Sequence, residues 1–226
     1  MATSYRYGDA PLPDDAMKQY YARRAGEYES IYHKPERQAD LRLLESRISE
    51  VFGGCNVLEI AGGTGYWTQF ASRLALSITA IDINPEVIEI AKDKPYQVAP
   101  HFLIADAYAL QTIEGVFDAI LSAFWWSHVP KQRLEEFLLS LRKRLPAGSL
   151  IVFLDNRYVE GSSTPISGTD EWGNSYQDRR LNDGTVHRVL KNFPDRDEIN
   201  SALEAHAGEI EIIELRYYWL VTCRTK

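Results

Sequence analysis

Short apolar runs alternate with amphipathic segments through the middle of the chain. Five runs have the length and composition of buried strands: 57–61, 77–81, 100–105, 117–123 and 149–154. Helical spacing or a helix-start signal marks the segments between them: 64–74, the segment that opens at Pro85, and 131–145. Strands that alternate with helices are typical of βαβ units. The pattern therefore predicts an α/β fold with a parallel sheet between two layers of helices.

Further segments flank this core on both sides. Before it, the pattern predicts helices over 14–31 and 36–51, and we interpret residues 14–52 as a helical lid. Residues 1–13 are expected to form a loose arm. After the core, a polar stretch rich in Gly, Ser and Asp breaks the alternation. It predicts a cap insertion over 156–192, placed over one end of the sheet.

The end of the chain predicts a hairpin. A helix is expected over 195–207, followed by apolar runs over 209–215 and 217–223. Parallel strands need a long crossover, and these two runs are separated by one residue. They must therefore pair antiparallel, which gives a seven-stranded, mostly parallel sheet.

Composition and charge limit the classes of function. The 226 residues are 45% hydrophobic and 25% charged, as in one globular domain over 1–226. Apolar runs reach only about ten residues, too short to span a bilayer, and no signal-peptide core is visible, so we expect a cytoplasmic protein. Cys55 and Cys223 are expected to be reduced core thiols. A formal charge of −7 gives no footprint for nucleic acid. The expected partner is a small molecule, and the expected state is a monomer or homodimer.

Residues 56–68 join a strand end, a glycine turn and a helix start. Gly62, Gly63 and Gly65 remove Cβ atoms from the turn, so the helix N-terminus can approach a ligand closely. Such a turn also fits binders of nicotinamide, flavin and phosphate. Alone, it leaves the cofactor open.

Three acids narrow that choice. Glu59 lies inside the first strand, where a buried charge needs a polar partner. Asp82 ends the second strand and can accept hydrogen bonds from both ribose hydroxyls. Asp106 follows the third strand and can accept from the exocyclic amine of adenine. Each acid also has an ordinary alternative role, as a core acid, a helix cap and a turn residue respectively. Together they favour a nucleoside ligand without a pyrophosphate.

With these motifs the chain resembles the class I S-adenosylmethionine-dependent methyltransferases. The matching segments are Val57-Leu58-Glu59-Ile60-Ala61-Gly62-Gly63-Thr64-Gly65, Ile81-Asp82-Ile83-Asn84, Ala105-Asp106-Ala107, Phe117-Asp118-Ala119-Ile120-Leu121-Ser122 and Leu145-Pro146-Ala147-Gly148-Ser149-Leu150. Ala61 stands where this family usually has its first glycine. The resemblance implies a Rossmann-like fold, S-adenosylmethionine as donor, S-adenosylhomocysteine as product, and no metal. The cofactor-binding residues that it implies are Glu59, Ala61, Gly62, Gly63, Gly65, Trp67, Thr68, Asp82, Ile83, Asp106, Ala107 and Ser122.

The predicted lid offers a second group of candidates. Tyr20, Arg24 and Tyr28 recur every four residues, so they share one helix face. Arg24 is a candidate partner for the carboxylate of the cofactor's methionine part. Tyr20 would help to close over the cofactor, and Tyr28 would reach the substrate. The alternative is an amphipathic helix with packed tyrosines and a solvated arginine.

An aromatic segment directly follows the fourth strand, at the edge where ligands bind in open α/β sheets. There, Trp125 and Trp126 can wall a methyl-transfer pocket and exclude water. His128 can act as a general base toward a hydroxyl or amine. The alternative places both tryptophans in the core and His128 at the start of the next helix.

The cap is basic although the chain is acidic. Its cationic candidates are Arg179, Arg180, His187, Arg188 and Lys191. They form an anion pocket if they point inward, and a solvated basic face if they do not. The lid motif, the glycine turn, His128-Val129-Pro130 and the Arg179-Arg180-Leu181-Asn182-Asp183-Gly184 segment resemble the phosphonate O-methyltransferase of dehydrophos biosynthesis. That resemblance implies that Arg179 and Lys191 bind the substrate anion and that His128 lies in the pocket.

The sequence therefore predicts methyl transfer to a small molecule, with O-methylation of a carboxylate or phosphonate favoured. N-methylation of a small heterocycle is the alternative within the class. A nicotinamide-dependent oxidoreductase and a non-catalytic binding module are the alternatives outside it.

Overall fold

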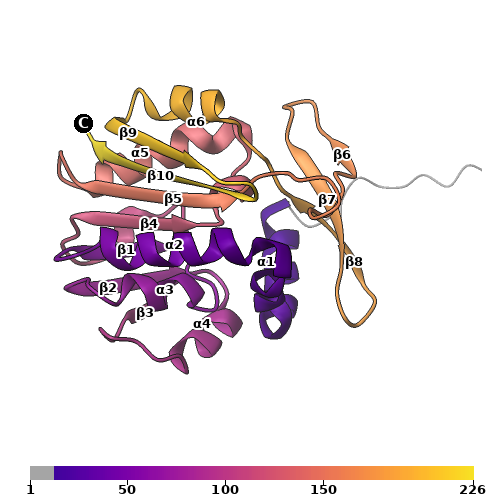
Figure 1. The fold of residues 1–226 in the computed structure, drawn as a ribbon, viewed down its shortest axis with the longest axis horizontal. Helices are drawn as coiled ribbons and strands as arrows, with labels where there is room; N and C mark the ends of the chain where they lie inside the picture. Colours follow the sequence, from indigo (N-terminus) through magenta and orange to yellow (C-terminus); the bar gives the residue numbers. More distant parts are fainter. Residues whose placement is uncertain (1–12) are drawn as a thin grey trace, which may run out of the picture.

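The computed structural model describes residues 13–226, so the predicted arm over 1–13 lies almost wholly outside the described residues. The described part contains a seven-stranded sheet in the order β3-β2-β1-β4-β5-β10-β9 (Figure 1). Its strands are β1 (Asn56–Ile60), β2 (Ser77–Asp82), β3 (His101–Ile104), β4 (Ala119–Ala123), β5 (Leu150–Asn156), β9 (Ala207–Glu214) and β10 (Tyr218–Thr225). β1 to β5 are parallel, and β10 pairs antiparallel with both β5 and β9. The predicted fold class is confirmed.

Helices cover both faces of this sheet, as the alternating pattern predicted. The helices of the Rossmann-like part are α2 (Gln38–Val51), α3 (Tyr66–Ala71), α4 (Pro85–Lys92), α5 (Leu134–Arg144) and α6 (Arg196–Leu203). α2 and α3 bury their apolar side chains against one face of the sheet, while α5 and α6 pack on the other (Figure 1). Leu44 and Ile48 of α2 and Phe137 of α5 are fully buried in these two layers. The burial of these two apolar layers stabilises the sheet and so holds the carboxyl ends of its parallel strands in place.

The N-terminal helix differs from its prediction. In place of one helix over 14–31, α1 (Pro13–Arg24) gives way to the 3₁₀ segment η1 (Ala25–His33), and η2 (Pro35–Arg37) precedes α2. Gly26 lies just after the change and is a poor α-helix former. Lys34 is extended with ψ +118°, as expected for a residue before proline. The helix predicted over 64–74 is shorter, and the one predicted over 131–145 opens with a 3₁₀ turn.

The polar insertion forms a second, three-stranded sheet. β6 (Gly168–Thr169), β7 (Ser175–Arg180) and β8 (Val186–Leu190) pair antiparallel in that order. This sheet lies beyond the ends of the large sheet, with α1 beside it (Figure 1). Arg23 of α1 pairs with Asp183 of the β7–β8 turn at 2.5 Å. The lid segment and the insertion therefore meet over the edge where the parallel strands end.

Candidate functional site

The turn between β1 and α3 presents backbone N–H groups at this edge. Gly62 N–H donates to a carbonyl of β2 over 2.9 Å, and Gly63 N–H donates to Asp82 Oδ2 over 3.0 Å. Gly63 has a φ of +57° and open space where a Cβ would stand, so a ligand can approach its backbone. Gly65 is required for another reason, since a Cβ there would lie 2.3 Å from Tyr96 Oη.

Two larger residues adopt strained backbone conformations near the turn. Ala61 has a φ of +53° and Phe124, directly after β4, has a φ of +59°. The left-handed region costs an L-residue roughly 1–2 kcal/mol. Ala61 thus adopts the conformation for which glycine is favoured. Strain of this kind concentrates at binding sites, where the surrounding structure holds it.

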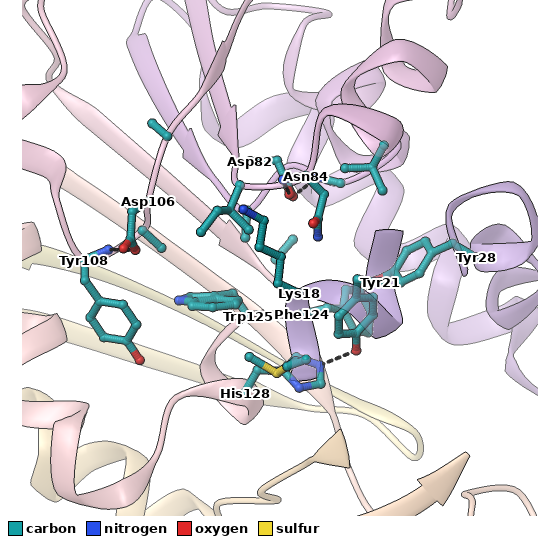
Figure 2. Close-up of a pocket in the computed structure, with 18 residues that line it drawn as sticks. Lys18, Tyr21, Tyr28, Asp82, Asn84, Asp106, Tyr108, Phe124, Trp125 and His128 are labelled. Atoms are coloured by element: carbon teal, nitrogen blue, oxygen red, sulfur yellow. Dashed lines mark hydrogen bonds between the residues drawn. The ribbon is translucent and has the colours of Figure 1, made fainter. Parts of the chain in front are cut away.

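Asp82 and Asp106 line one cavity, which we call the turn cavity (Figure 2). Asp82 Oδ1 accepts from Asn84 N–H over 2.9 Å, and Asp106 Oδ1 accepts from Tyr108 N–H over 2.8 Å. Burial raises the pKa of Asp82 to about 6, although the backbone N–H groups act in the opposite direction. Both acids are therefore fixed by backbone donors while they line the cavity.

The turn cavity and the solvent at its mouth together hold about 930 Å³ of space free of protein atoms. Its lining residues are Met17, Lys18, Tyr21, Tyr28, Ala61, Gly63, Asp82, Ile83, Asn84, Val87, Ala105, Asp106, Ala107, Tyr108, Ala123, Phe124, Trp125 and His128. The cavity is mostly apolar with a few polar groups, an arrangement that binds and orients a largely apolar ligand.

Glu59 lies beneath the glycine turn with an exposed fraction of 1%. A Cβ on Gly62 would lie 3.4 Å from its carboxyl carbon. Within the described residues, neither carboxyl oxygen of Glu59 has a hydrogen-bond partner, and the Thr68 hydroxyl has none either. Burial raises the pKa of Glu59 to about 8, and nearby Thr68 lowers it only in part. Among the described residues, Thr68 is therefore the one nearby group that can serve as the polar partner predicted for Glu59. At pH 7 the neutral form of the Glu59 carboxyl predominates.

Three other predicted residues are part of the core. Trp126 packs edge-on against Phe153 and Trp219 at 4.9 and 5.8 Å between ring centroids, and it does not line the turn cavity. The prediction that Trp126 walls the pocket is not supported, whereas Trp125 does line the cavity. Trp67 is buried and donates to Tyr32 Oη over 3.1 Å. Ser122 is fully buried in β4, with no hydrogen bond from its hydroxyl to any described residue.

The three lid residues stay together despite the break in the helix. The guanidinium carbon of Arg24 lies 5.6 Å from the ring centre of Tyr20 and 5.3 Å from that of Tyr28. Their predicted common face is confirmed. Tyr20 is 1% exposed and packs with Leu181 and Val189 of the insertion. Its ring therefore ties the lid to the insertion, and its predicted contact with a cofactor remains untested.

His128 lies at the floor of the turn cavity and is held from both sides (Figure 2). Its Nδ1 lies 2.7 Å from the Leu190 carbonyl, so Nδ1 carries the proton and donates. Nε2 then accepts from the Tyr21 hydroxyl over 2.8 Å, and Tyr21 Oη accepts from Arg179 over 3.3 Å. Burial lowers the pKa of His128 well below its usual range, and Lys191 and Arg179 lower it further. The imidazole is neutral at pH 7.

Lys191 is buried beneath His128 and has a carboxylate partner. Its Nζ donates to Asp155 Oδ1 over 2.8 Å and to Ser127 Oγ over 2.5 Å. Burial lowers the pKa of Lys191 to about 8 against the opposing effect of Asp155. A buried ion pair of this kind holds a fixed geometry, because the loss of either partner leaves an uncompensated charge.

A second hollow opens between the lid, the end of β5 and the insertion, and we call it the cationic hollow. The cationic side chains that line it in the described part of the chain are Arg24, Lys34, Arg37, Arg179, Arg180 and Lys191. The two acids among its lining residues are Glu27 and Asp178. It shares Tyr21, Tyr28, Phe124 and His128 with the turn cavity. The two sites therefore lie side by side and share a wall made of these four side chains.

Comparison with known proteins agrees with this geometry. Residues 57–148 match the model of a methyltransferase domain. The solved DhpI-SAM-HEP complex is 28% identical, with a TM-score of 0.79, and the alignment covers 96% of this chain and 100% of that one. The DhpI-SAH complex gives 29% and 0.77, with 96% and 98% covered. The malonyl-[acyl-carrier protein] O-methyltransferase of Serratia marcescens is 25% identical over 204 residues, 89% of this chain and 71% of that protein.

The chain is a class I S-adenosylmethionine-dependent methyltransferase. Its resemblance to the phosphonate O-methyltransferase of dehydrophos biosynthesis is confirmed by the DhpI structures. The predicted donor is supported by the SAM and SAH that those neighbours hold. The oxidoreductase and the non-catalytic module considered from the sequence are set aside.

The residues of the turn cavity fit such a donor. Gly63 leaves open space beside its backbone. Outside the lining, the Glu59 oxygens lie next to Gly62 of the turn and have no hydrogen-bond partner among the described residues. Asp82 and Asp106 supply carboxylate oxygens at two neighbouring strand ends.

In the described residues, no group of three or more His, Cys, Asp or Glu side chains is placed to hold a metal ion. No helix in that part of the chain has the length and hydropathy needed to cross a membrane.

The sequence interpretation of this methyltransferase missed several lining residues. Tyr21 is the most consequential, because it lines both cavities and bonds to His128. The four-residue spacing pointed to Tyr20, and one residue of phase on a helix rotates the side chain by about 100°. Lys18, from the same helix, reaches into the turn cavity (Figure 2). Asp155 was also missed, although an acid at the end of the apolar β5 strand was a usable signal.

Proposed function

We propose that this methyltransferase transfers the methyl group of S-adenosylmethionine to an anionic oxygen of a small acceptor, a carboxylate or a phosphonate. The observation that carries the proposal is the cationic hollow, which lies beside the turn cavity and shares Tyr21, Tyr28, Phe124 and His128 with it. Six cationic side chains line it against two acids, in a chain whose formal charge is −7. The Serratia marcescens relative named above is an O-methyltransferase by name, which supports methylation on oxygen.

In this proposal, different residues bind the donor, bind the acceptor and exclude water. The glycine turn, Asp82 and Asp106 hold the donor, which supplies an electrophilic methyl group. Arg179 offers a fork of N–H donors that suits a carboxylate or phosphonate. Phe124, which lines both sites, and Trp125, which lines the turn cavity, exclude water from the reacting groups. Rate enhancement then comes mainly from positioning the two reactants.

His128 acts in this proposal as a positioning residue. Its Nε2 accepts from Tyr21, and burial together with the nearby Lys191 and Arg179 keeps its pKa low, so it is a weak proton acceptor. An ionised carboxylate or phosphonate is already nucleophilic at neutral pH and needs no base. The same geometry disfavours acceptors that must lose a proton, including most hydroxyls and amines.

Arg179→Gln tests the proposal. We expect the KM for an anionic acceptor to rise at least about tenfold through loss of charge-assisted hydrogen bonds, while the Kd for S-adenosylhomocysteine stays unchanged. Arg188→Gln is the matched control, because Arg188 is exposed on β8 and lies over the ring of Tyr176. Equal KM values for Arg179→Gln, Arg188→Gln and the parent would refute anion binding at Arg179.

A further inference from the structure

Arg37 is a buried cation without a carboxylate partner. It lines the cationic hollow with an exposed fraction of 5%. Its Nε donates to Ser162 Oγ over 3.0 Å and its Nη1 donates to Asn156 Oδ1 over 3.2 Å. The rings of Tyr217 and Tyr218 lie 5.2 and 5.6 Å from its guanidinium carbon. No carboxylate oxygen of the described residues lies within 4.0 Å of an Arg37 nitrogen. Buried charges are normally paired, so this one is matched to an anion from outside.

A second cation lies beside it. Lys34 lines the same hollow, and its Nζ donates to the Ser162 carbonyl. Burial lowers the pKa of Lys34, and the positive charge of Arg37 lowers it further. The acid of this segment, Glu36, accepts from the Ser162 hydroxyl over 2.7 Å and is exposed. Two cations therefore converge on Ser162 at the seam between the lid and the insertion, where the exposed carboxylate of Glu36 accepts from the same residue.

Arg37 and Lys34 are separate from the cations near His128, but hydrogen bonds through Asn156 and Asp155 connect Arg37 to Lys191. Lys191 bonds to Asp155 Oδ1, which also accepts from Asn156 Nδ2 over 3.1 Å. Asn156 in turn accepts from Arg37. Lys191 is neutralised by Asp155, whereas Arg179 and Arg37 bond only to neutral groups in the described residues. The cationic hollow thus has two sites for an anion, one at Arg179 and one at Arg37 with Lys34.

We propose that the acceptor carries two anionic groups, one presented for methylation beside Arg179 and the other bound by Arg37 and Lys34. The substrate class is then a small dianionic acid, such as a dicarboxylate or a phosphonocarboxylate. The inference rests on the proposed function and deepens it. A monoanionic acceptor would leave the Arg37 site without a counter-charge inside a hollow covered by the lid and the insertion.

The test measures acid binding to the protein loaded with S-adenosylhomocysteine. Dicarboxylates from malonate to adipate are titrated beside monocarboxylates of equal carbon number, and 3-phosphonopropionate beside propylphosphonate. We expect at least one diacid to bind about tenfold or more tightly than its monoacid partner, from an added charge-assisted contact. Lys34→Met should remove most of that preference and leave monoacid affinity unchanged. Lys92→Met, which removes an exposed lysine paired with Glu89 on α4, should change neither.

Each other outcome has a definite meaning. Equal affinities for mono- and diacids, or equal weakening of both by Lys34→Met, would overturn the second anion site and leave the proposed function standing. Failure of every acid to bind would count against the proposed function itself. Arg37→Gln gives a second reading, provided that its melting temperature in the presence of S-adenosylhomocysteine matches that of the parent.

Discussion

The turn cavity and the cationic hollow share four side chains, yet they are built in opposite ways. The turn cavity depends on backbone N–H groups and on acids that follow consecutive strands, all between Glu59 and Tyr108. The hollow depends on side chains that meet across long stretches of chain. Tyr21 and His128 are 107 positions apart, and Arg37 and Asn156 are 119 apart. The donor site is therefore a local property of the fold, whereas the acceptor site exists only when the lid and the insertion are in place.

This difference predicts separable effects on the two substrates. Changes in the strand-end acids should act on donor binding alone. Changes in the insertion, and in lid residues that line the hollow but not the turn cavity, should act on acceptor binding alone. A variant that changed the donor Kd and the acceptor KM by the same factor would contradict this distinction.

The largest effect is expected from Asp82→Ala. The carboxylate accepts from the Gly63 and Asn84 N–H groups and is the predicted ribose ligand, so its loss should affect the turn as well as the ligand. The Kd for S-adenosylhomocysteine should rise by roughly a hundredfold, the equivalent of two charge-assisted hydrogen bonds, as measured by isothermal titration. Asp93→Ala, at the end of α4, is the control. An unchanged Kd for Asp82→Ala would remove Asp82 from the donor site.

The pH dependence of donor binding should be the next largest effect. Burial raises the pKa of Asp82 from 3.8 to about 6, and only the ionised carboxylate accepts from both ribose hydroxyls. Donor affinity should therefore fall by up to about tenfold per pH unit below pH 6. Glu59, with a pKa of about 8, is already neutral in this range. Asp82→Asn should abolish the step, and a step that persists in that variant would assign it to another group.

The same raised pKa has the opposite sign for folding without ligand. The folded chain retains the Asp82 proton up to about pH 6, whereas the unfolded chain releases it near 3.8. The contribution of this group to the free energy of unfolding is therefore fully present below pH 3.8 and is lost as pH rises through 6. Donor affinity and this part of the stability thus move in opposite directions over one pH window.

A smaller effect is expected from Tyr21→Phe. The change removes the hydrogen bond to the neutral His128 Nε2 and the long one, 3.3 Å, from the Arg179 guanidinium, which keeps its bonds to Gln177. The acceptor KM should rise about fivefold, and the donor Kd should not change. Tyr176→Phe is the matched control, because it loses a hydroxyl bond to Asp170 in the insertion. An altered donor Kd with a normal acceptor KM would place Tyr21 on the donor side.

The sequence predicted the large sheet and the turn cavity because their signals are local. The five parallel strands appear as apolar runs, including the partly exposed edge strand β3, and the glycine turn needs residues that are neighbours in the chain. The hollow was only partly predictable. Arg179 and Lys191 were selected by their charge, but nothing local showed that Lys191 would pair with Asp155. Trp126 was expected in the pocket because it follows the fourth strand directly. That position does not show whether an aromatic side chain packs in the core or lines the pocket. Arg37 was not predicted as a site residue, because a single arginine in a polar segment is normally expected to be exposed to solvent.

The central claim is that this methyltransferase modifies an anionic oxygen, and mass spectrometry tests it most directly. The protein is incubated with trideuteromethyl S-adenosylmethionine, small carboxylates and phosphonates, and their neutral amide and amine counterparts. The account predicts that labelled methyl appears as esters of the acids and is absent from the neutral compounds. Label that appears only on amines or heterocycles would contradict it.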